Sequence, residues 1–416
     1  MAQTQPSKKF YLDLHLHSKY SRATSPRMDL EGIVSGCQTK GIQVAACADF
    51  THPFWFKELE IKLELQSNGL YRLKNSETEI FFILSTEIAA IYSKAGRVRR
   101  IHNIVIVPTL EEARELNRQL AKIGNLSADG RPILGLDSAK LAKILFGISR
   151  EALLIPAHIW TPWFSLFGSK SGFDKIEECF EDYTDKIFAL ETGLSSDPLM
   201  NWQLSSLDKF TLVSNSDAHS LQNLGREANV VAGQPSYDNV YQALVGRKNF
   251  IRTIEFFPEE GKYHYDGHRS CLVSLSPEEA LNTHNLCPKC QKPLTIGVRH
   301  RVNELADRPF GFKPKKLTPF KSIVPLVKII ADVLGIGENS KKVQTIYNKI
   351  IQALGSEFEI LLDTPPAKLL DFDNQLGSAI IKVRQGKVKL TAGYDGVYGQ
   401  IKIKTGEKSA KQEKLF

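Results

Sequence analysis

Short apolar runs alternate with longer amphipathic stretches along about the first 255 residues of the chain. The apolar runs are rich in β-branched and aromatic side chains, which is typical of strands, whereas stretches such as 110–123 and 137–145 have helical spacing. Strands and helices in alternation predict an α/β architecture with parallel strands, either a barrel or an open sheet. The seven predicted strands are 11–17, 43–50, 80–87, 103–108, 153–158, 187–192 and 211–217.

Histidines and carboxylates gather where these strands end. His15 and His17 are spaced i, i+2, which places both imidazoles on one face of a strand. An isolated pair of this kind is more often packed or solvated than metal-bound. Here, however, all six histidines before residue 258 flank strands, and five of them lie at the C-terminal end, where (β/α) barrels build their active sites. This distribution predicts a site for two or three divalent ions, with candidate ligands His15, His17, Asp49, His52, Glu87, His102, His158, Asp217 and His219.

The order of these residues resembles the polymerase and histidinol phosphatase (PHP) superfamily of metal-dependent phosphoesterases. The resemblance implies a distorted seven-stranded (β/α) barrel over residues 1–258, with Glu87, Asp217 and His219 in the catalytic machinery. The second motif departs from the pattern of the superfamily. Many members have an aspartate directly followed by a histidine, whereas two residues separate Asp49 from His52 here. Asp49 is therefore either a substitute ligand or a structural residue. The ligand sets implied are His15, His17, Glu87 and Asp217 for one ion, bridging Glu87 with His102 and His158 for a second, and His52 with His219 for a third.

Four longer motifs are similar to the endonuclease Q family within that superfamily: 48–53, 156–165, 191–198 and 216–220. Members of this family nick DNA on the 5′ side of deaminated bases such as uracil, hypoxanthine and xanthine, and at abasic sites. The resemblance implies a metal-dependent DNA repair endonuclease whose partner is double-stranded DNA with a damaged base. A nuclease of this kind needs walls for an extruded nucleotide and groups that hold a phosphate. The candidates are Arg22, Trp163, Glu191, Ser195 and Arg226, of which Glu191 is equally suited to orient a ligand histidine.

Residues 259–308 contain a second set of metal-ligand motifs. His268-x2-Cys271 and Cys287-x2-Cys290 are separated by 15 residues, a spacing typical of a tetrahedral structural Zn²⁺ site. His264, His284 and His300 are nearby alternatives for the fourth ligand, but the spacing favours His268. The remaining cysteines, Cys37, Cys47 and Cys179, are scattered in apolar surroundings and are typical of reduced core thiols.

The second half of the chain is basic. Residues 221–416 contain 29 Lys and Arg against 20 Asp and Glu, which favours a polyanionic partner, although a solvated basic surface would look the same. Residues 309–405 predict a helical or mixed DNA-binding domain, with helices over 321–334 and 340–354. The turn-rich stretch 393–399 suits either a tight hairpin or an approach to a phosphate or a base.

The last residues, 406–416, predict a flexible tail. Gln412, Leu415 and Phe416 resemble the short peptides that dock on replication sliding clamps. No apolar run is long enough to span a membrane, and no apolar signal region precedes the first strand, so a cytoplasmic, nucleoid-associated location is expected.

Two other functions fit part of the pattern. A small-molecule phosphomonoesterase would explain the barrel but not the cysteine motifs or the basic half. A DNA-binding scaffold with an inactive barrel would explain the charge, but its ligand set should then be incomplete. The sequence therefore favours the endonuclease.

Overall fold

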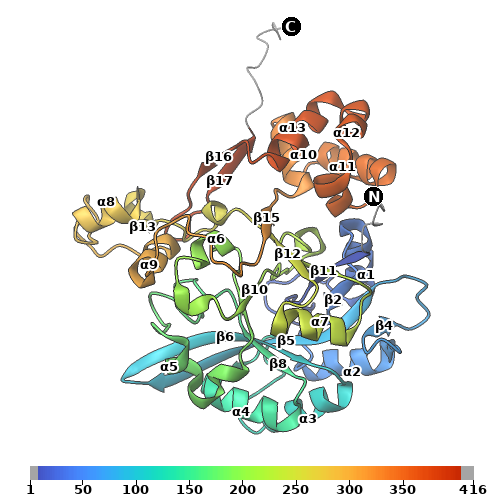
Figure 1. Ribbon diagram of the computed structural model, residues 1–416, viewed down its shortest axis with the longest axis vertical. Helices are drawn as coiled ribbons and strands as arrows, with labels where there is room; N and C mark the ends of the chain where they lie inside the picture. Colours follow the sequence, from blue (N-terminus) through green and yellow to red (C-terminus); the bar gives the residue numbers. More distant parts are fainter. Residues whose placement is uncertain (1–7, 404–416) are drawn as a thin grey trace, which may run out of the picture. The chain divides into compact units, whose positions relative to one another are not determined.

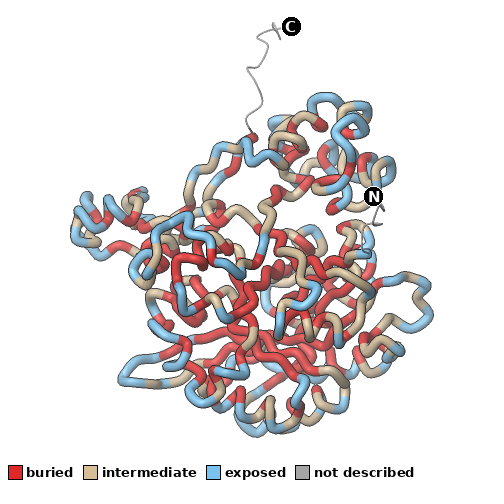
Figure 2. Tube along the Cα trace, viewed as in Figure 1, coloured by how far each residue is buried: buried red, intermediate tan, exposed pale blue. Residues whose placement is uncertain are grey.

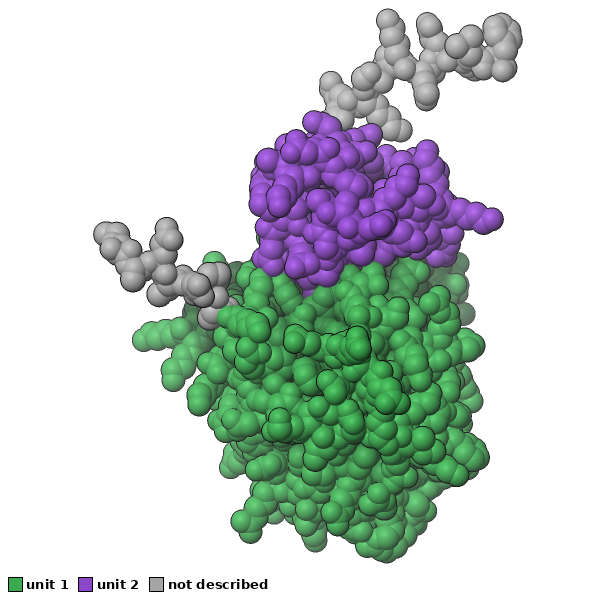
Figure 3. Space-filling model, turned by 90° about the vertical axis from the view of Figure 1, so that its right-hand side faces the viewer, with its two compact units in different colours: residues 1–322, 392–399 green, residues 323–391, 400–416 purple. Residues whose placement is uncertain are grey.

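The computed structural model describes residues 8–403 (Figure 1). The chain forms two compact units, drawn in different colours in Figure 3. The first contains the chain up to Ser322 together with Ala392–Gly399, and the second contains Ile323–Thr391 and the chain from Gln400. This division falls at Ser322, and the predicted boundaries at 258 and 308, which lie within the first unit, stay predictions. The predicted tail with Gln412, Leu415 and Phe416 lies outside the described residues.

The first unit is built on a mixed sheet of eleven strands and a separate parallel pair. The order β15-β12-β11-β1-β2-β5-β4-β3 is extended by β6 beside β5, β8 beside β6 and β7 beside β5. The sheet strands are β1 (Lys9–Asp13), β2 (Val44–Ala46), β3 (Leu63–Leu65), β4 (Tyr71–Leu73), β5 (Phe81–Lys94), β6 (Arg97–Val107), β7 (Ile133–Leu134), β8 (Leu153–Pro156), β11 (Ala228–Ala232), β12 (Phe250–Glu255) and β15 (Phe320–Ser322); the pair is β9 (Ala189–Glu191) and β10 (Thr211–Val213).

All seven predicted strands are present, as β1, β2, β5, β6, β8, β9 and β10. The expectation that they run parallel is wrong for β6, which is antiparallel to both β5 and β8. Because β9 and β10 form their own ladder, the hydrogen-bonded ladders of residues 8–403 do not run round a closed barrel. The mixed α/β class is thus confirmed, and closure of a seven-stranded barrel is not.

Apolar side chains of these strands make the core of the first unit, and Figure 2 shows the sheet as its most buried part. Phe10, Leu12 and Ile104 are among its members, all at most 1% exposed. The helices of this part are α1 (Leu30–Lys40), α2 (Pro53–Lys62), α3 (Leu110–Leu120), α4 (Ser138–Ile148), α5 (Ile176–Phe180), α6 (Pro198–Asn201) and α7 (Tyr237–Gly246). Most of them begin at a side-chain cap, such as Asp29, whose carboxylate accepts the Gly32 N–H, but α2 and α5 have no such cap.

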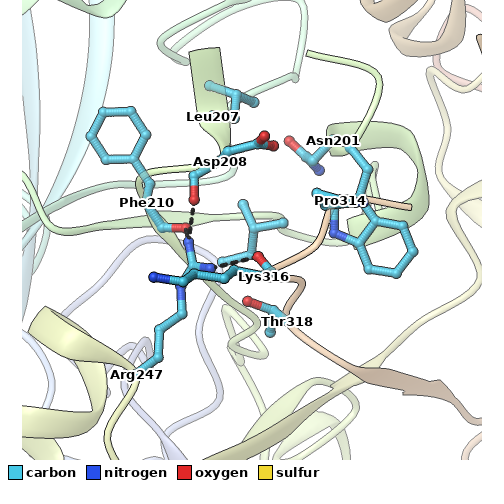
Figure 4. A pocket seen from close by; sticks show the side chains of 10 residues that line it. Asn201, Leu207, Asp208, Phe210, Arg247, Pro314, Lys316 and Thr318 are labelled. Atoms are coloured by element: carbon cyan, nitrogen blue, oxygen red, sulfur yellow. Dashed lines mark hydrogen bonds between the residues drawn. The ribbon is translucent and has the colours of Figure 1, made fainter. Parts of the chain in front are cut away.

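The cysteine motifs and the basic linker also belong to the first unit. The cysteine module contains β13 (Asp266–His268), β14 (Val273–Leu275), α8 (Pro277–Asn282) and α9 (Val298–Leu305). The linker that follows is held in place by arginines. Arg247 donates to the carbonyls of Lys316, at 2.8 Å, and Asp208, at 2.7 Å, in the small pocket of Figure 4. Arg308 forms a two-pronged pair with the Asp208 carboxylate.

The second unit is a helical domain with one hairpin. Both predicted helices are confirmed, although the first begins only at Leu326, after Pro325. Ser340 caps the second helix as predicted, with its hydroxyl accepting the Val343 N–H. The elements are α10 (Leu326–Leu334), α11 (Lys341–Leu354), α12 (Pro366–Phe372), α13 (Asn374–Arg384), β16 (Val388–Thr391) and β17 (Gln400–Ile403). Among the described residues, no helix combines the length and apolarity that crossing a membrane requires.

Candidate metal centres

Two extended segments that follow strands bring the first ligands together. After β1, Leu16 forms a parallel bridge with Ala218, and the His17 N–H donates to the Ala218 carbonyl at 3.1 Å. Side chains alternate along extended chain, so His15 and His17 project to the same side of their segment. Asp217, next to Ala218, projects to that side as well. The bridge between distant segments therefore assembles the His-x-His and Asp-x-His motifs.

His102 reaches the same edge because β6 runs antiparallel to its neighbours. The sequence placed His102 before the fourth strand, as the exception among the histidines, whereas it lies inside β6 opposite Ala89 of β5. The first half of β6 thus lies beside the C-terminal ends of β5 and β8. The Ala157 N–H donates to the His102 carbonyl at 3.0 Å. Strand direction therefore places His102 near Glu87 and His158.

The first cluster consists of His15, His17, Glu87 and Asp217, whose ligand atoms all lie within 4.8 Å of one another. His17 Nε2 is 3.0 Å from Asp217 Oδ1 and 3.2 Å from Glu87 Oε2. His15 Nε2 is 3.4 Å from the same Glu87 oxygen. The Nε2 atoms of both histidines and Asp217 Oδ1 are buried and make no hydrogen bond within the described residues. Buried polar atoms are normally hydrogen-bonded, so this convergence fits ligands that face a cation.

The second cluster consists of Glu87, His102 and His158. Glu87 Oε1 is 2.6 Å from His102 Nδ1 and 3.2 Å from His158 Nε2. The two imidazole nitrogens are 3.1 Å apart. Glu87 thus directs one oxygen to each cluster, as a bridging carboxylate does between two ions. The structure brings together the same residues that the resemblance assigned to the first and second ions, and they could hold metal ions.

Charges within the clusters strongly shift the affinity for protons. Burial lowers the pKa of His15 and His17, but the neighbouring carboxylates outweigh this effect and hold both pKa values well above the ordinary value. Burial raises the pKa of Glu87, but His102, Arg131 and His15 outweigh it and hold that pKa well below its usual range. An ion that binds to an imidazole must displace its proton, so metal affinity should rise with pH.

Arg131 is a residue of the site that the sequence did not indicate. Its Nη1 donates to Glu87 Oε2 at 3.0 Å. The preceding Gly130 packs so tightly that a Cβ there would lie 2.3 Å from both Asp49 Oδ2 and Ser21 Oγ. The glycine therefore lets this loop reach the site and deliver the arginine. A Gly-Arg dipeptide in a polar loop gives no signal of such a role.

Glu191 lies behind His15, with both carboxylate oxygens directed at neighbouring protein groups. Its carboxylate oxygens are 3.1 and 3.2 Å from His15 Nδ1. The carboxylate also accepts the His158 N–H at 2.8 Å and the Asn215 side-chain N–H at 2.8 Å. With both oxygens occupied and the side chain buried, contact with a flipped base is the less suitable of its two predicted roles. The geometry favours the other one, orientation of a ligand histidine.

Asp49 has the same relation to His17. Its Oδ1 is 3.1 Å from His17 Nδ1, and its Oδ2 accepts the Ser18 N–H and the Ser21 hydroxyl. The structure thus places Asp49 behind a ligand ring and outside both clusters, which favours the structural one of its two predicted roles. Thr161 contacts the ring of His158 in the same way as Asp49 contacts the ring of His17, because its hydroxyl is 3.2 Å from His158 Nδ1.

Removal of the Glu191 charge should weaken metal binding. We expect Glu191→Gln to lower the affinity for divalent ions about 10- to 100-fold, because a supporting carboxylate fixes the ring and increases the basicity of the ligand nitrogen. Calorimetric titration of the metal-depleted protein with Mn²⁺ measures this affinity. The exposed Glu77, changed to Gln, is the control, and an unchanged affinity in Glu191→Gln would contradict the assignment.

The pair predicted for a third ion, His52 and His219, is not part of a cluster of three or more ligands in the described residues. His52 stacks on Tyr20 with 4.5 Å between ring centroids. His219 lies against His17 with 4.4 Å between ring centroids, and its Nδ1 donates to the Asp217 carbonyl at 3.0 Å. A third ion would therefore need ligands beyond these two side chains.

The turns that carry two of the candidate ligands, His158 and Asp217, and the supporting residue Asp49 are strained. Asp49, His158 and Asp217 have φ values of 36°, 30° and 47°, a region that residues with a Cβ rarely adopt. Such strain is typical of functional sites, where the surrounding structure enforces it. Gly193 lies so close that a Cβ there would be 2.5 Å from His158 Cβ, so only glycine fits beside this ligand.

The four remaining predicted substrate residues have different environments. Trp163 is half-buried and packs edge-to-face on Tyr263. Ser195 is buried, and Arg22 is exposed. Arg226 donates from Nε to the Ser216 carbonyl at 2.8 Å, and its Nη2 contacts the Asp217 carbonyl. The guanidinium thus supports the turn that holds Asp217, which leaves less of it for the predicted phosphate contact.

A third cluster joins His268, Cys271, Cys287 and Cys290, whose ligand atoms lie within 4.8 Å of one another. Burial raises the pKa of the Cys287 thiol, but the backbone N–H groups of Cys290 and Lys289 outweigh this effect and lower it, which favours the thiolate. Three sulfurs and one imidazole are the donor set of a closed structural site. The clustered histidine is the one that the spacing favoured.

The alternative histidines have other surroundings. His300 Nδ1 is 2.6 Å from Asp266 Oδ2, and the ion pair outweighs burial and raises its pKa. His264 is buried, and neither His264 nor His284 belongs to a metal cluster among the described residues.

A pair of buried carboxyl groups lies deeper in this unit. Burial raises the pKa of Glu255 to about 8, and burial together with Glu255 raises that of Glu227 well above its ordinary value. Glu255 accepts hydrogen bonds from the hydroxyls of Thr192 and Ser214, both at 3.2 Å. These carboxyl groups therefore hold protons in the folded protein at pH values where the unfolded chain has lost them.

This protonation makes stability depend on pH. A carboxyl with a raised folded-state pKa costs no stability below its unfolded pKa, and the cost grows as the pH rises toward the folded value. For Glu255 this window runs from about pH 4.5 to about pH 8. We expect the free energy of unfolding of Glu255→Gln to increase relative to that of the parent as the pH rises through this window. Denaturation at pH 5 and pH 8 measures the gain, with exposed Glu111→Gln as control, and a pH-independent difference would contradict the prediction.

The chain is similar over almost its whole length to two solved structures. One is the lesion-specific endonuclease PfuEndoQ from Pyrococcus furiosus, with 31% identity and a TM-score of 0.85, covering 95% of this chain and 96% of that one. The other is Endonuclease Q in complex with a 27-mer duplex substrate that has an abasic lesion at the active site. It has 32% identity and a TM-score of 0.84, with 95% and 97% covered.

The chain is also similar to two protein sequences. YqxK of Bacillus subtilis (strain 168) is 30% identical over 418 residues, which cover 95% of this chain and all of YqxK. MJ0043 of Methanocaldococcus jannaschii is 32% identical over 253 residues, which cover 59% of this chain but only 31% of that protein. A family model described as the MJ0043 C-terminal domain matches residues 325–387, within the second unit.

The fold and the site define a mixed α/β protein with two adjoining histidine–carboxylate clusters of metal-binding type and a separate histidine–cysteine cluster. With identities above 30% over nearly complete chains, the protein belongs to the endonuclease Q family. The resemblance found in the sequence is confirmed.

Proposed function

We propose that the chain is a metal-dependent DNA repair endonuclease that hydrolyses the phosphodiester on the 5′ side of deaminated bases or at abasic sites. The observation that carries the proposal is the match over 95% of the chain to Endonuclease Q bound to a duplex with an abasic lesion. The paired clusters that share Glu87 support it, because phosphodiester hydrolysis commonly uses two adjoining ions.

The first cluster would hold one ion and the second cluster another, with Zn²⁺, Mn²⁺ or Mg²⁺ as candidates. His52 and His219 remain candidates for a third ion. Divalent ions in such a site lower the pKa of bound water and neutralise the charge on the scissile phosphate. A structural Zn²⁺ would occupy the cluster of His268, Cys271, Cys287 and Cys290.

The chain's own residues then position the reaction. Glu191 and Asp49 would fix the rings of His15 and His17, and Arg131 would offset the charge of Glu87. Because His219 Nδ1 donates to a carbonyl, the neutral ring has its lone pair on Nε2. This tautomer suits His219 to accept a proton at that atom.

Trp163 and Ser195 are the proposed substrate contacts beside the clusters. An enzyme that acts on a damaged nucleotide must take it out of the stack and hold it between aromatic or apolar walls. The excess of Lys and Arg in residues 221–416 would grip the phosphates of the duplex, so binding should weaken steeply with salt. Such an activity agrees with the expected cytoplasmic, nucleoid-associated location.

The test uses the purified chain with Mg²⁺ or Mn²⁺ and end-labelled duplexes that differ at one central position: thymine, deoxyuridine, deoxyinosine or an abasic site. A single nick immediately 5′ of the altered nucleotide, absent with thymine, supports the proposal. Absence of any nick together with turnover of a small phosphate ester would favour the phosphomonoesterase. Absence of both, with salt-sensitive DNA binding, would favour the scaffold.

The C-terminal peptide is a separate part of the proposal. Gln412, Leu415 and Phe416 would dock on a replication sliding clamp and bring the nuclease to newly copied DNA. Binding of the full chain to a purified clamp, compared with a chain that ends before Gln412, tests this. Undiminished binding without the peptide would contradict it.

A further inference from the structure

An exposed aromatic and basic surface lies beside the loops that leave the metal clusters. It consists of Trp163, Lys262, Tyr263 and Tyr398, which come from three separate stretches of the first unit. Trp163 packs edge-to-face on Tyr263 with 5.7 Å between ring centroids. Lys262 Nζ is 5.7 Å from the ring centroids of both Tyr263 and Tyr398. We call this set the aromatic surface.

The aromatic surface is joined to the metal clusters by short connections. Trp163 is five residues after the ligand His158, and the Thr161 hydroxyl contacts both the His158 ring and the Trp163 carbonyl. The second connection is made by Gly261, which directly precedes Lys262. A Cβ added to Gly261 would lie 3.2 Å from the Leu194 carbonyl oxygen, on the loop that follows Glu191. The surface therefore adjoins the site where the scissile phosphate of the proposed function would bind.

The turn that presents Tyr398 is fixed by backbone contacts. It is the Gly-rich stretch 393–399, which the sequence alone left open between a hairpin and a nucleic-acid contact. Gly393 N–H donates to the Glu259 carbonyl, Gly396 N–H to Lys262 and Gly399 N–H to Glu260, at 2.8, 2.8 and 3.1 Å. A Cβ on Gly393 would lie 2.4 Å from the Gly261 carbonyl oxygen. Glycine is thus required at position 393 for this close approach.

A large ring is left in solvent on this fixed turn. Tyr398 is 69% exposed, and Lys262 beside it is exposed and forms no ion pair within the described residues. An aromatic face next to an unpaired cation matches the chemistry of single-stranded nucleic acid, where bases stack on rings and phosphates contact cations. A duplex that has lost or extruded one base presents an unstacked base of this kind.

We propose that the aromatic surface binds the unpaired nucleobase opposite the lesion, with Tyr398 stacked on the base and Lys262 against a neighbouring phosphate. The inference rests on the proposed function and deepens it, because it assigns lesion recognition to residues outside the metal clusters. Because the backbone of this turn is already fixed, binding need not order it, which lowers the cost of association.

The experiment uses the full chain with Asp217→Ala, to prevent nicking, and a duplex with one abasic site opposite 2-aminopurine. Tyr398→Ala should bind this duplex about tenfold more weakly, and the quenching of 2-aminopurine fluorescence by the ring should be lost. The affinity of Tyr398→Ala for an intact duplex should change less than twofold. Tyr398→Phe should retain both properties. Lys262→Gln should reduce the slope of affinity against salt by about one. Leu65→Ala, 55% exposed on the edge strand β3, is the matched control and should change neither property.

Unchanged binding and quenching in Tyr398→Ala, with a melting temperature equal to that of the parent, would overturn the inference. The proposed function is tested separately, by nicking in the chain without substitutions. If that chain nicks the abasic duplex and Tyr398→Ala binds normally, only the aromatic surface is refuted. If it does not nick but Tyr398→Ala loses binding and quenching, the surface stands and the endonuclease does not.

Discussion

Replacement of Asp217 by alanine should abolish nicking and largely spare DNA binding. Asp217 Oδ1 is 3.0 Å from His17 Nε2 and 3.7 Å from His15 Nε2, and it has no hydrogen-bond donor among the described residues. Burial raises its pKa, but the two histidines outweigh this effect and lower it far below the ordinary value. The lowered pKa favours the negative charge of Asp217 at neutral pH, and this charge faces the position that an ion would occupy.

The size of the effect follows from the loss of that ion. A correctly held ion supplies several kcal/mol of transition-state stabilisation, and each 1.36 kcal/mol is tenfold in rate, so the rate should fall about 10³-fold or more. Binding depends instead on Lys and Arg spread over the second half of the chain, so the affinity should change little.

Single-turnover nicking of an abasic duplex and anisotropy on the same duplex separate the two quantities. Asp217→Asn keeps the shape of the side chain and should lose nearly as much activity, because the charge is what holds the ion. Asp182→Ala removes a charge from an exposed position and is the matched control. Nicking at the rate of the parent in Asp217→Ala would refute the ligand assignment.

Replacement of Cys287 by serine should remove one metal ion per chain and unfold the cysteine module. Among the described residues, the hydrophobic cluster around the cysteines has four buried members, Val273, Ala280, Cys287 and Leu294, with Cys271, Leu275 and Cys290 packed against them, so a candidate ligand cysteine is itself part of this small core. So small a core cannot stabilise a fold without a metal or another cross-link. Loss of the ion therefore means loss of the local structure.

Metal content by mass spectrometry and thermal denaturation together test this prediction. Cys37→Ser is the control, because Cys37 is equally buried but lies in α1, outside the three clusters of the described residues. The control should lose stability through packing alone and keep its full metal content. An unchanged metal content in Cys287→Ser would show that the cluster holds no ion.

The sequence by itself determined the ligands whose geometry is local. On an extended chain the i, i+2 spacing fixes the face of a side chain, so His15 and His17 were paired before any tertiary contact was known. The spacing His268-x2-Cys271 likewise selected His268 among four histidines, and the structure places it with the three thiols. Strand positions were also predicted, because short β-branched runs between turns depend on neighbours in the chain.

Only the tertiary structure decided features that depend on strand direction and on contacts distant in sequence. The antiparallel course of β6 brought His102 to the same edge as Glu87, which no local pattern records. The roles of Asp49 and Glu191 depend on which atoms their carboxylates meet 32 and 176 residues away. Arg131 became part of the site because Gly130 allows its loop to approach. Spacing fixes the direction of a side chain, but its partner is fixed by long-range register, and that register exists only in the folded chain.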